Sequence, residues 1–217
     1  MTPITLTSNG AGAGLSAAQH NRVLRNTYWL LALSMVPTVL GAWIGVSTGI
    51  ARAMSPGIGL VVFLAGAFGF MFAIEKTKNS AAGVPVLLAF TFFMGLMLSR
   101  LVGQVLGLAN GASLVMLAFA GTGAIFLGMA SLSSVIKRDL SSMGKFLFIG
   151  AVMLLVAGIA NVFIQSSVLT ITLAVLAIGI FSAFILHDLK RVQDGLETNY
   201  ISATLSVYLS IYNVFQS

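Results

Sequence analysis

Charged residues are scarce in this chain and stand between long apolar runs. Of its 217 residues, eleven are Lys or Arg and five are Asp or Glu, which is 7% where about a quarter is usual. Hydrophobic residues make up 58%. Too few charges remain to cover a water-soluble surface. The composition therefore predicts a polytopic membrane protein and excludes a disordered chain and an ordinary globular enzyme.

The charged residues also mark where helices can cross the bilayer, because a charge at its centre costs about 2.5 to 3.5 kcal/mol. Between them lie apolar runs that match the roughly 20 residues a helix needs to cross the hydrocarbon. Two longer runs are divided by turn signals, at Gly107-Leu-Ala-Asn-Gly111 and at Gln165-Ser-Ser167. The predicted fold is all-α, with seven transmembrane helices at residues 27–49, 57–74, 82–98, 112–136, 146–164, 168–186 and 200–217.

Basic residues are divided unequally between the two sides of this predicted bundle. Nine of the eleven fall on the side of the N-terminus, and only Arg52 and Arg100 fall on the other. Cytoplasmic loops carry an excess of Lys and Arg, so the N-terminus is predicted to be cytoplasmic and the C-terminus periplasmic. Residues 1–26, with little apolar bulk, are predicted to form a flexible cytoplasmic tail, and residues 27–217 the transmembrane domain.

Small residues recur at four-residue spacing within the predicted spans. Gly41 and Gly45 form one such ridge, and Ala120, Ala124 and Gly128 form another. Ridges of this kind let helix backbones approach closely in lipid. Packing within the chain's own bundle and packing against a second copy are the two alternatives.

The last predicted span differs from the others in carrying a polar stripe. As a helix, residues 200–217 place five polar residues on one face, with steps of four, four, three and four: Ser202, Ser206, Ser210, Asn213 and Ser217. Lipid does not tolerate such a face, so this helix is predicted to be central, with six helices surrounding it. Hydrogen bonds between helices and a wet cavity along the stripe remain alternative interpretations.

A dense group of ionisable residues lies between the sixth and seventh predicted spans. Its members are His187, Asp188, Lys190, Arg191, Asp194 and Glu197. Most of this group is predicted to be a solvated cytoplasmic loop. Asp188 directly follows an apolar run. Its alternative position is at the inner mouth of the bundle, where it would face the polar stripe.

The chain lacks the residues that several kinds of chemistry need. The chain has no cysteine, which excludes disulfides and thiolate metal sites. Its two histidines, His20 and His187, form neither a His-Glu-x-x-His zinc site nor a bis-histidine haem site. The basic residues gather on no single face, so no nucleic acid is expected as a partner. The chain is predicted to be no enzyme and to hold no cofactor or metal.

Two segments resemble those of a known family. Val23-Leu-Arg-Asn-Thr-Tyr-Trp-Leu-Leu31 precedes the first span, and Glu197-Thr-Asn-Tyr-Ile201 leads into Ala203-Thr-Leu-Ser-Val-Tyr-Leu-Ser-Ile-Tyr-Asn-Val-Phe215. Both are similar to the bacterial YccA branch of the transmembrane Bax-inhibitor-motif family. The resemblance extends over all seven predicted helices, and its most specific part holds the signature positions Glu197, Asn199, Tyr200 and Tyr208.

The resemblance implies a bacterial inner-membrane protein in which six helices surround a central seventh. It further implies binding to the membrane-anchored ATP-dependent protease FtsH, together with its HflK and HflC companions. The chain would modulate this protease by inhibiting or occupying it, or as a slowly processed substrate. The tail that starts at Met1 and ends at Asn21 is the predicted handle from which the protease pulls.

The wider family implies an alternative function, a pH-sensitive calcium or cation leak gated by two aspartates on the sixth and seventh helices. Asp188 matches the first aspartate, but Ser210, in Val207-Tyr-Leu-Ser210, stands in the second position. Two carboxylates are needed to share a proton in such a pair. Asp188 and Ser210 are candidates for ion or pH sensing, and modulation of the protease is the first interpretation.

Overall fold

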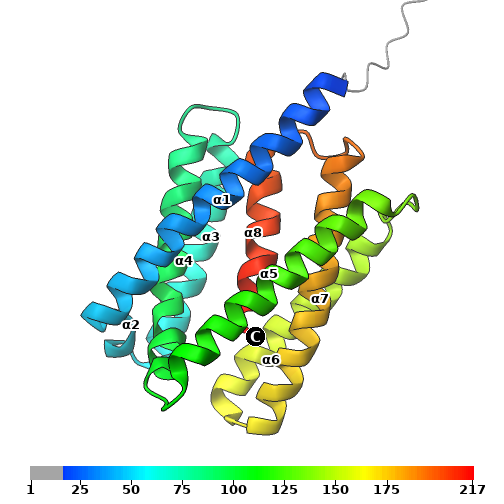
Figure 1. Ribbon diagram of the computed structural model, residues 1–217. Coiled ribbons are helices and arrows are strands. Elements are labelled where there is room, and N and C mark those ends of the chain that lie inside the picture. Colours follow the sequence, from blue (N-terminus) through cyan, green and yellow to red (C-terminus); the bar gives the residue numbers. More distant parts are fainter. Residues whose placement is uncertain (1–16) are drawn as a thin grey trace, which may run out of the picture.

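The computed structural model describes residues 17–217, and the regular elements in this part of the chain are all helices (Figure 1). They are α1 (Ala17–Thr48), α2 (Ile50–Ala53), α3 (Pro56–Thr77), α4 (Gly83–Leu106), α5 (Gly111–Val135), α6 (Met143–Ile164), α7 (Ser167–Gln193) and α8 (Tyr200–Gln216). The predicted tail lies outside the described residues as far as residue 16. Its remainder, from Ala17, belongs to α1.

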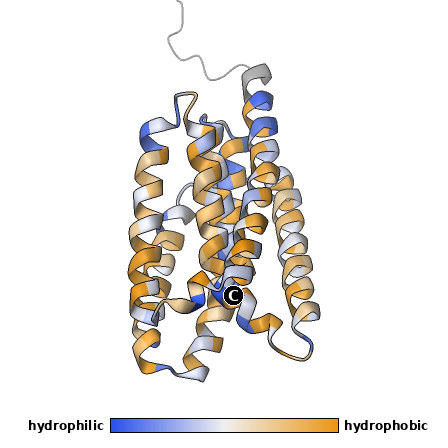
Figure 2. Cartoon of the chain, turned by 90° about the vertical axis from the view of Figure 1, so that its left-hand side faces the viewer, coloured by the Kyte–Doolittle hydropathy of each residue, from blue (hydrophilic) through white to orange (hydrophobic). Residues whose placement is uncertain are grey.

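Six helices of the described chain are long and apolar enough to cross a membrane, which confirms the predicted all-helical membrane protein. The six segments are Asn21–Thr48, Pro56–Thr77, Gly83–Leu106, Gly111–Val135, Met143–Ile164 and Ser167–Gln193. Hydrophobic residues run along these helices and hydrophilic residues gather mainly near their ends (Figure 2). α8, which has 17 residues and coincides with the predicted seventh span, is not among the six.

Both predicted turn signals are confirmed. α4 ends before Gly107 and α5 begins at Gly111. Between α6 and α7, Gln165 has a φ of 56°, a left-handed conformation that ends a helix. The Asn161 side chain holds this turn, since its oxygen accepts from the Ser166 N–H at 3.1 Å and its nitrogen donates to the Thr170 hydroxyl at 2.7 Å.

α7 continues beyond residue 186, where the predicted sixth span ends. It runs to Gln193, so the prediction of a loop from His187 onward was wrong, and the loop covers only residues 194–199. The physical reason is the spacing of the apolar residues within the ionisable group. Leu189 and Val192 lie three residues apart and are fully buried, which holds this last part of α7 against the bundle.

α1 and α4 pack closely because glycine removes side chains from their interface. A Cβ atom at Gly41 would lie 2.2 Å from the Phe92 carbonyl oxygen, and a Cβ atom at Gly95 would lie 2.1 Å from the Thr38 carbonyl oxygen. The Gly41 ridge therefore packs within the chain's own bundle. At Gly128, by contrast, a Cβ atom would meet nothing within 4 Å, so this ridge does not pack inside the described bundle.

α8 contacts α1, α3, α4, α5 and α7. In Figure 1 it lies between α7 on one side and the packed helices α1 and α4 on the other. Eight of its 17 residues are buried, whereas α6 buries none. The core of the bundle joins Phe90 and Met94 of α4 to Val207 and Tyr208 of α8. α8 is thus held by contacts along most of its length.

Candidate functional site

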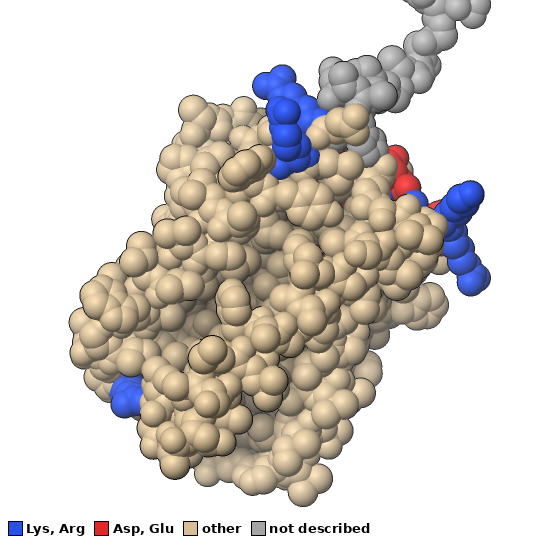
Figure 3. Space-filling model, viewed as in Figure 1, with Lys and Arg blue, Asp and Glu red and all other residues tan. Residues whose placement is uncertain are grey.

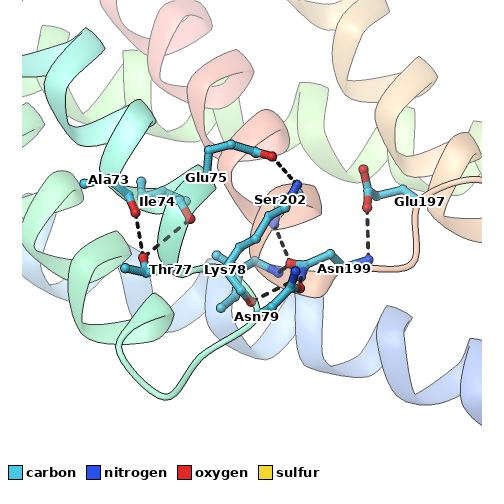
Figure 4. Close-up of polar contacts among 10 residues, drawn as sticks. Ala73, Ile74, Glu75, Thr77, Lys78, Asn79, Glu197, Asn199 and Ser202 are labelled. Atoms are coloured by element: carbon cyan, nitrogen blue, oxygen red, sulfur yellow. Dashed lines mark hydrogen bonds and ion pairs between the residues drawn. The ribbon is translucent and has the colours of Figure 1, made fainter.

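The site predicted from the sequence lies at the start of α8 and along its faces. Asn199 caps this helix, because its side-chain oxygen accepts hydrogen bonds from the N–H groups of Ile201 at 2.9 Å and Ser202 at 3.1 Å. The amide nitrogen of the same side chain donates to Asn79 Oδ1 at 2.8 Å and to the Lys78 carbonyl at 3.2 Å. One side chain therefore caps α8 and ties it to the connection between α3 and α4 (Figure 4).

Two charged residues frame this cap. The Glu197 carboxylate accepts from the N–H of Asn199 at 2.9 Å and orders the loop before α8. Lys78 forms an ion pair with Glu75 at 2.6 Å across one turn of α3. Gly83 lets α4 start close by, since a Cβ atom there would lie 2.6 Å from Ile201 Cδ1. Of the predicted signature positions, Glu197 thus orders the loop and Asn199 ties the start of α8 to the connection between α3 and α4.

Tyr208, another predicted signature position, makes a hydrogen-bonded contact deep in the bundle. Its side chain is 1% exposed and its hydroxyl lies 2.9 Å from the Thr38 hydroxyl of α1. Phe90 of α4 packs edge-on against its ring, with centroids 6.1 Å apart. Tyr208 therefore joins α8 to both α1 and α4.

Two residues with no role predicted from the sequence lie on the same face of α8 as Tyr208. Thr204, four residues before Tyr208, donates to the Tyr200 carbonyl of α8 at 2.7 Å, and its oxygen lies 3.4 Å from the Thr27 carbonyl of α1. Tyr212, four residues after it, donates to the Met94 carbonyl of α4 at 3.3 Å. The four-residue spacing of the three hydroxyl-bearing residues was the available signal.

The predicted polar stripe of α8 has a different environment. Ser210 is buried, Ser202 and Asn213 are half-buried, and Ser206 is exposed. Ser210 donates to the Ser206 carbonyl at 3.1 Å, and Asn213 donates to the Leu209 carbonyl at 2.7 Å. Each of these two side chains thus donates to a carbonyl one turn earlier in α8, and the described residues show no hydrogen bond from either of them to a neighbouring helix.

Asp188 is bonded to its neighbour in sequence. Its carboxylate lies 3.1 Å from His187 Nδ1, and the two side chains are 11% and 8% exposed. The opposite ring nitrogen of His187 lies against α6, where a Cβ atom at Gly144 would be 2.8 Å from Nε2. Asp188 and Ser210 thus have separate partners, and no hydrogen bond joins them within the described residues.

Most of the chain matches one known protein family. The family described as "Inhibitor of apoptosis-promoting Bax1" matches residues 20–217, which include all eight helices apart from the first residues of α1. The chain belongs to this Bax1-I family. The matched segment ends with the capped and tyrosine-bonded α8, the helix whose sequence carried the resemblance.

Relatives of this Bax1-I protein span nearly its whole length. An uncharacterized membrane protein of Vibrio cholerae is 37% identical over 91% of this chain and 86% of the relative. The Escherichia coli K12 protein named modulator of FtsH protease YccA is 34% identical over 91% of this chain and 87% of the relative. An uncharacterized protein of Neisseria meningitidis is 38% identical over 91% and 88%.

The remaining signature position of this Bax1-I protein, Tyr200, lies at a surface pocket. The pocket has a volume of about 550 Å³ and is lined from α1 by Asn26, Trp29 and Leu33 among others. In the described part of the chain, no three His, Asp or Glu side chains lie close enough together to hold a metal ion. The site geometry is that of a helix junction, built from the Asn199 amide cap and the hydroxyl groups of Tyr208 and Tyr212.

Proposed function

We propose that this chain is a bacterial inner-membrane protein that binds the protease FtsH and modulates its activity without being an enzyme itself. The observation that carries the proposal is the 34% identity to the modulator of FtsH protease YccA, over 91% of this chain and 87% of that one. A second E. coli relative, 34% identical, is named an inner membrane protein. HflK and HflC are proposed as companions in the same complex.

The proposed topology has seven spans, with α8 as the seventh and central one. Its 17 residues correspond to about 25 Å of helix at 1.5 Å per residue, the lower end of what crosses a bilayer. Its contacts with five other helices support the central position. The N-terminus is proposed to be cytoplasmic and the C-terminus periplasmic, since nine of eleven basic residues lie on the N-terminal side.

The proposed mode of modulation is occupation of the protease by a bundle that resists extraction. The segment from Met1 to Asn21 carries no charged residue and is the proposed handle. Behind it, α1 packs on α4 through glycine backbone contacts and on α8 through the Tyr208 contact. Pulling on α1 would have to separate these contacts before any later helix could leave the membrane.

Affinity purification of the full chain from bacterial membranes in mild detergent tests the proposal. FtsH is expected to co-elute, and HflK and HflC with it. An unrelated polytopic protein of similar size, carrying the same tag, is the control. Recovery of FtsH at the level of this control would overturn the proposal.

The calcium or cation leak is the second candidate function. The separate partners of Asp188 and Ser210 favour the protease modulator over it, because a gate of the aspartate-pair type needs two carboxylates in contact. Calcium flux into proteoliposomes containing the full chain decides between the two. A flux that Asp188→Ala abolishes would put the leak first.

A further inference from the structure

The two ends of the bundle differ sharply in charge. All five acidic residues lie at or near the end where α8 begins: Glu75, Asp139, Asp188, Asp194 and Glu197. The other end has Arg52 in α2 and Arg100 in α4. In the view of Figure 3, red atoms occur only at the first end, and a separate blue patch lies over α2. Two positive charges at this second end thus have no acidic residue near them.

Both arginines bond to backbone carbonyls of facing segments. Arg52 donates to the Gly103 carbonyl, and Arg100 Nη1 donates to the Met54 carbonyl at 3.3 Å. A guanidinium has five N–H donors, and within the described residues Arg100 uses one of its side-chain donors in a hydrogen bond. Its charge is not neutralised by a carbonyl, so a favourable place for an anion remains beside it.

A pocket of about 310 Å³ lies beside Arg100, between α3, α4, α6 and α8. Its polar side chains are Arg100 and Gln104 of α4 and Tyr212 and Gln216 of α8. Gly59, in the first turn of α3, lies beside the guanidinium, since a Cβ atom there would be at an ordinary contact distance of 3.4 Å from Arg100 Nη1. That first turn also presents the positive end of the α3 dipole. The polar side of the pocket therefore offers hydrogen-bond donors and positive charge, and no acidic side chain is among its lining residues.

The rest of the pocket is apolar and leads towards the middle of the bundle. Phe63 lies one turn further into α3 than Gly59, and Met97 lies about one turn further into α4 than Arg100. Val162 supplies the wall from α6. A ligand that fits has an anionic head at the helix ends and an apolar tail along the spans.

We infer that this pocket binds an anionic phospholipid, with its phosphate at Arg100 and part of an acyl chain against Phe63 and Met97. The charge of the pocket selects the phosphate, and its continuity with the membrane-spanning segments of α3 and α4 selects a lipid over a soluble anion. The adjacent Arg52 adds positive potential at the same end, which favours phosphatidylglycerol over zwitterionic lipids.

Native mass spectrometry of the delipidated full chain, titrated with phosphatidylglycerol or phosphatidylcholine, tests the inference. One phosphatidylglycerol is expected to bind at least about tenfold more tightly to the wild type than to Arg100→Gln, as for the loss of one charge-assisted hydrogen bond. Arg138→Gln, which removes an exposed arginine at the opposite end, is the matched control and is expected to change nothing. Gly59→Leu keeps the charge but fills the pocket, and is expected to weaken binding as well.

Three results would overturn the inference. The first is equal affinity of the wild type for phosphatidylglycerol and phosphatidylcholine. The second is unchanged phosphatidylglycerol binding by both Arg100→Gln and Gly59→Leu. The third concerns competition for the bound lipid. If inorganic phosphate displaces it at the same concentrations as dihexanoyl phosphatidylglycerol does, the site binds free phosphate and not a lipid.

Discussion

The phenol oxygen of Tyr208 lies 2.9 Å from the hydroxyl oxygen of Thr38, 170 residues away in the chain. The Thr38 oxygen also lies 2.8 Å from the Ser34 carbonyl, and the Tyr208 oxygen lies 3.5 Å from the Thr91 carbonyl of α4. This contact connects the last helix to the first in the centre of the bundle. The free energy of unfolding is expected to depend on it.

Removal of the Tyr208 hydroxyl tests its contribution. Tyr208→Phe is expected to lower the free energy of unfolding by about 0.6 kcal/mol, the usual value for a hydrogen bond between membrane helices. Tyr208→Ala also removes the ring that packs on Phe90 and is expected to cost about 3 to 5 kcal/mol. SDS titration of the detergent-solubilised protein measures both. Equal stability of Tyr208→Phe and Tyr208→Ala would contradict this account.

The close approach of α1 and α4 predicts unequal effects for the same substitution at two glycines. Gly41→Leu places a side chain against the Phe92 backbone and is expected to destabilise the bundle by about 1 to 3 kcal/mol or more. Gly128→Leu is the matched control, because its Cβ atom meets open space. Thermal unfolding in detergent compares the two. If both variants melt at the wild-type temperature, α1 and α4 are not packed as described.

The cap of α8 predicts a similar contrast between two asparagines. Asn199→Ala removes both the cap and the bonds to Asn79 and Lys78, and is expected to cost about 1 to 2 kcal/mol. Asn110 stands at the start of α5 but makes no capping bond with its side chain, so Asn110→Ala is expected to have little effect. Limited proteolysis of the loop at residues 194–199 measures local opening. Faster cleavage in Asn110→Ala than in Asn199→Ala would refute the assigned role.

The proposed handle predicts that turnover depends on the N-terminal segment. Deletion of residues 2–16, which leaves α1 intact, is expected to lengthen the half-life several-fold in cells that contain FtsH. Replacement of the deleted residues by an uncharged Gly and Ser segment of the same length is expected to restore degradation. The reason is that the handle would need a certain length and not a particular sequence. Pulse-chase labelling measures the half-life, and SDS titration checks that the bundle is unchanged. Wild-type turnover of the shortened chain would exclude the handle.

Parts of the fold that depend on single residues were predictable from the sequence. The turn at residues 165–167 follows from polar residues in an apolar run, and Asn161 and Gln165 form it locally. The end of α7 was not predictable in this way. Leu189 and Val192 extend the helix past Leu186 only because other helices are present to bury them.

The faces of α8 also include one feature that the sequence predicted and one that it did not. The spacing of Ser202, Ser206, Ser210 and Asn213 predicted one polar face, which is correct as helix geometry. That spacing did not reveal that Tyr208 and Tyr212 make the hydrogen bonds with α1 and α4. A hydroxyl can bond its own helix or a neighbouring helix, and the choice depends on which carbonyls lie across the interface.

The sequence by itself determined that this protein is a membrane protein and which apolar runs form its first six spans. These properties follow from the cost of placing each charge in hydrocarbon, which is local to each segment. Only the tertiary structure decided which glycines face another helix, that Asp188 pairs with His187, and that Arg100 borders a pocket. These depend on contacts between helices far apart in the chain, and such contacts are set by how all the helices pack together.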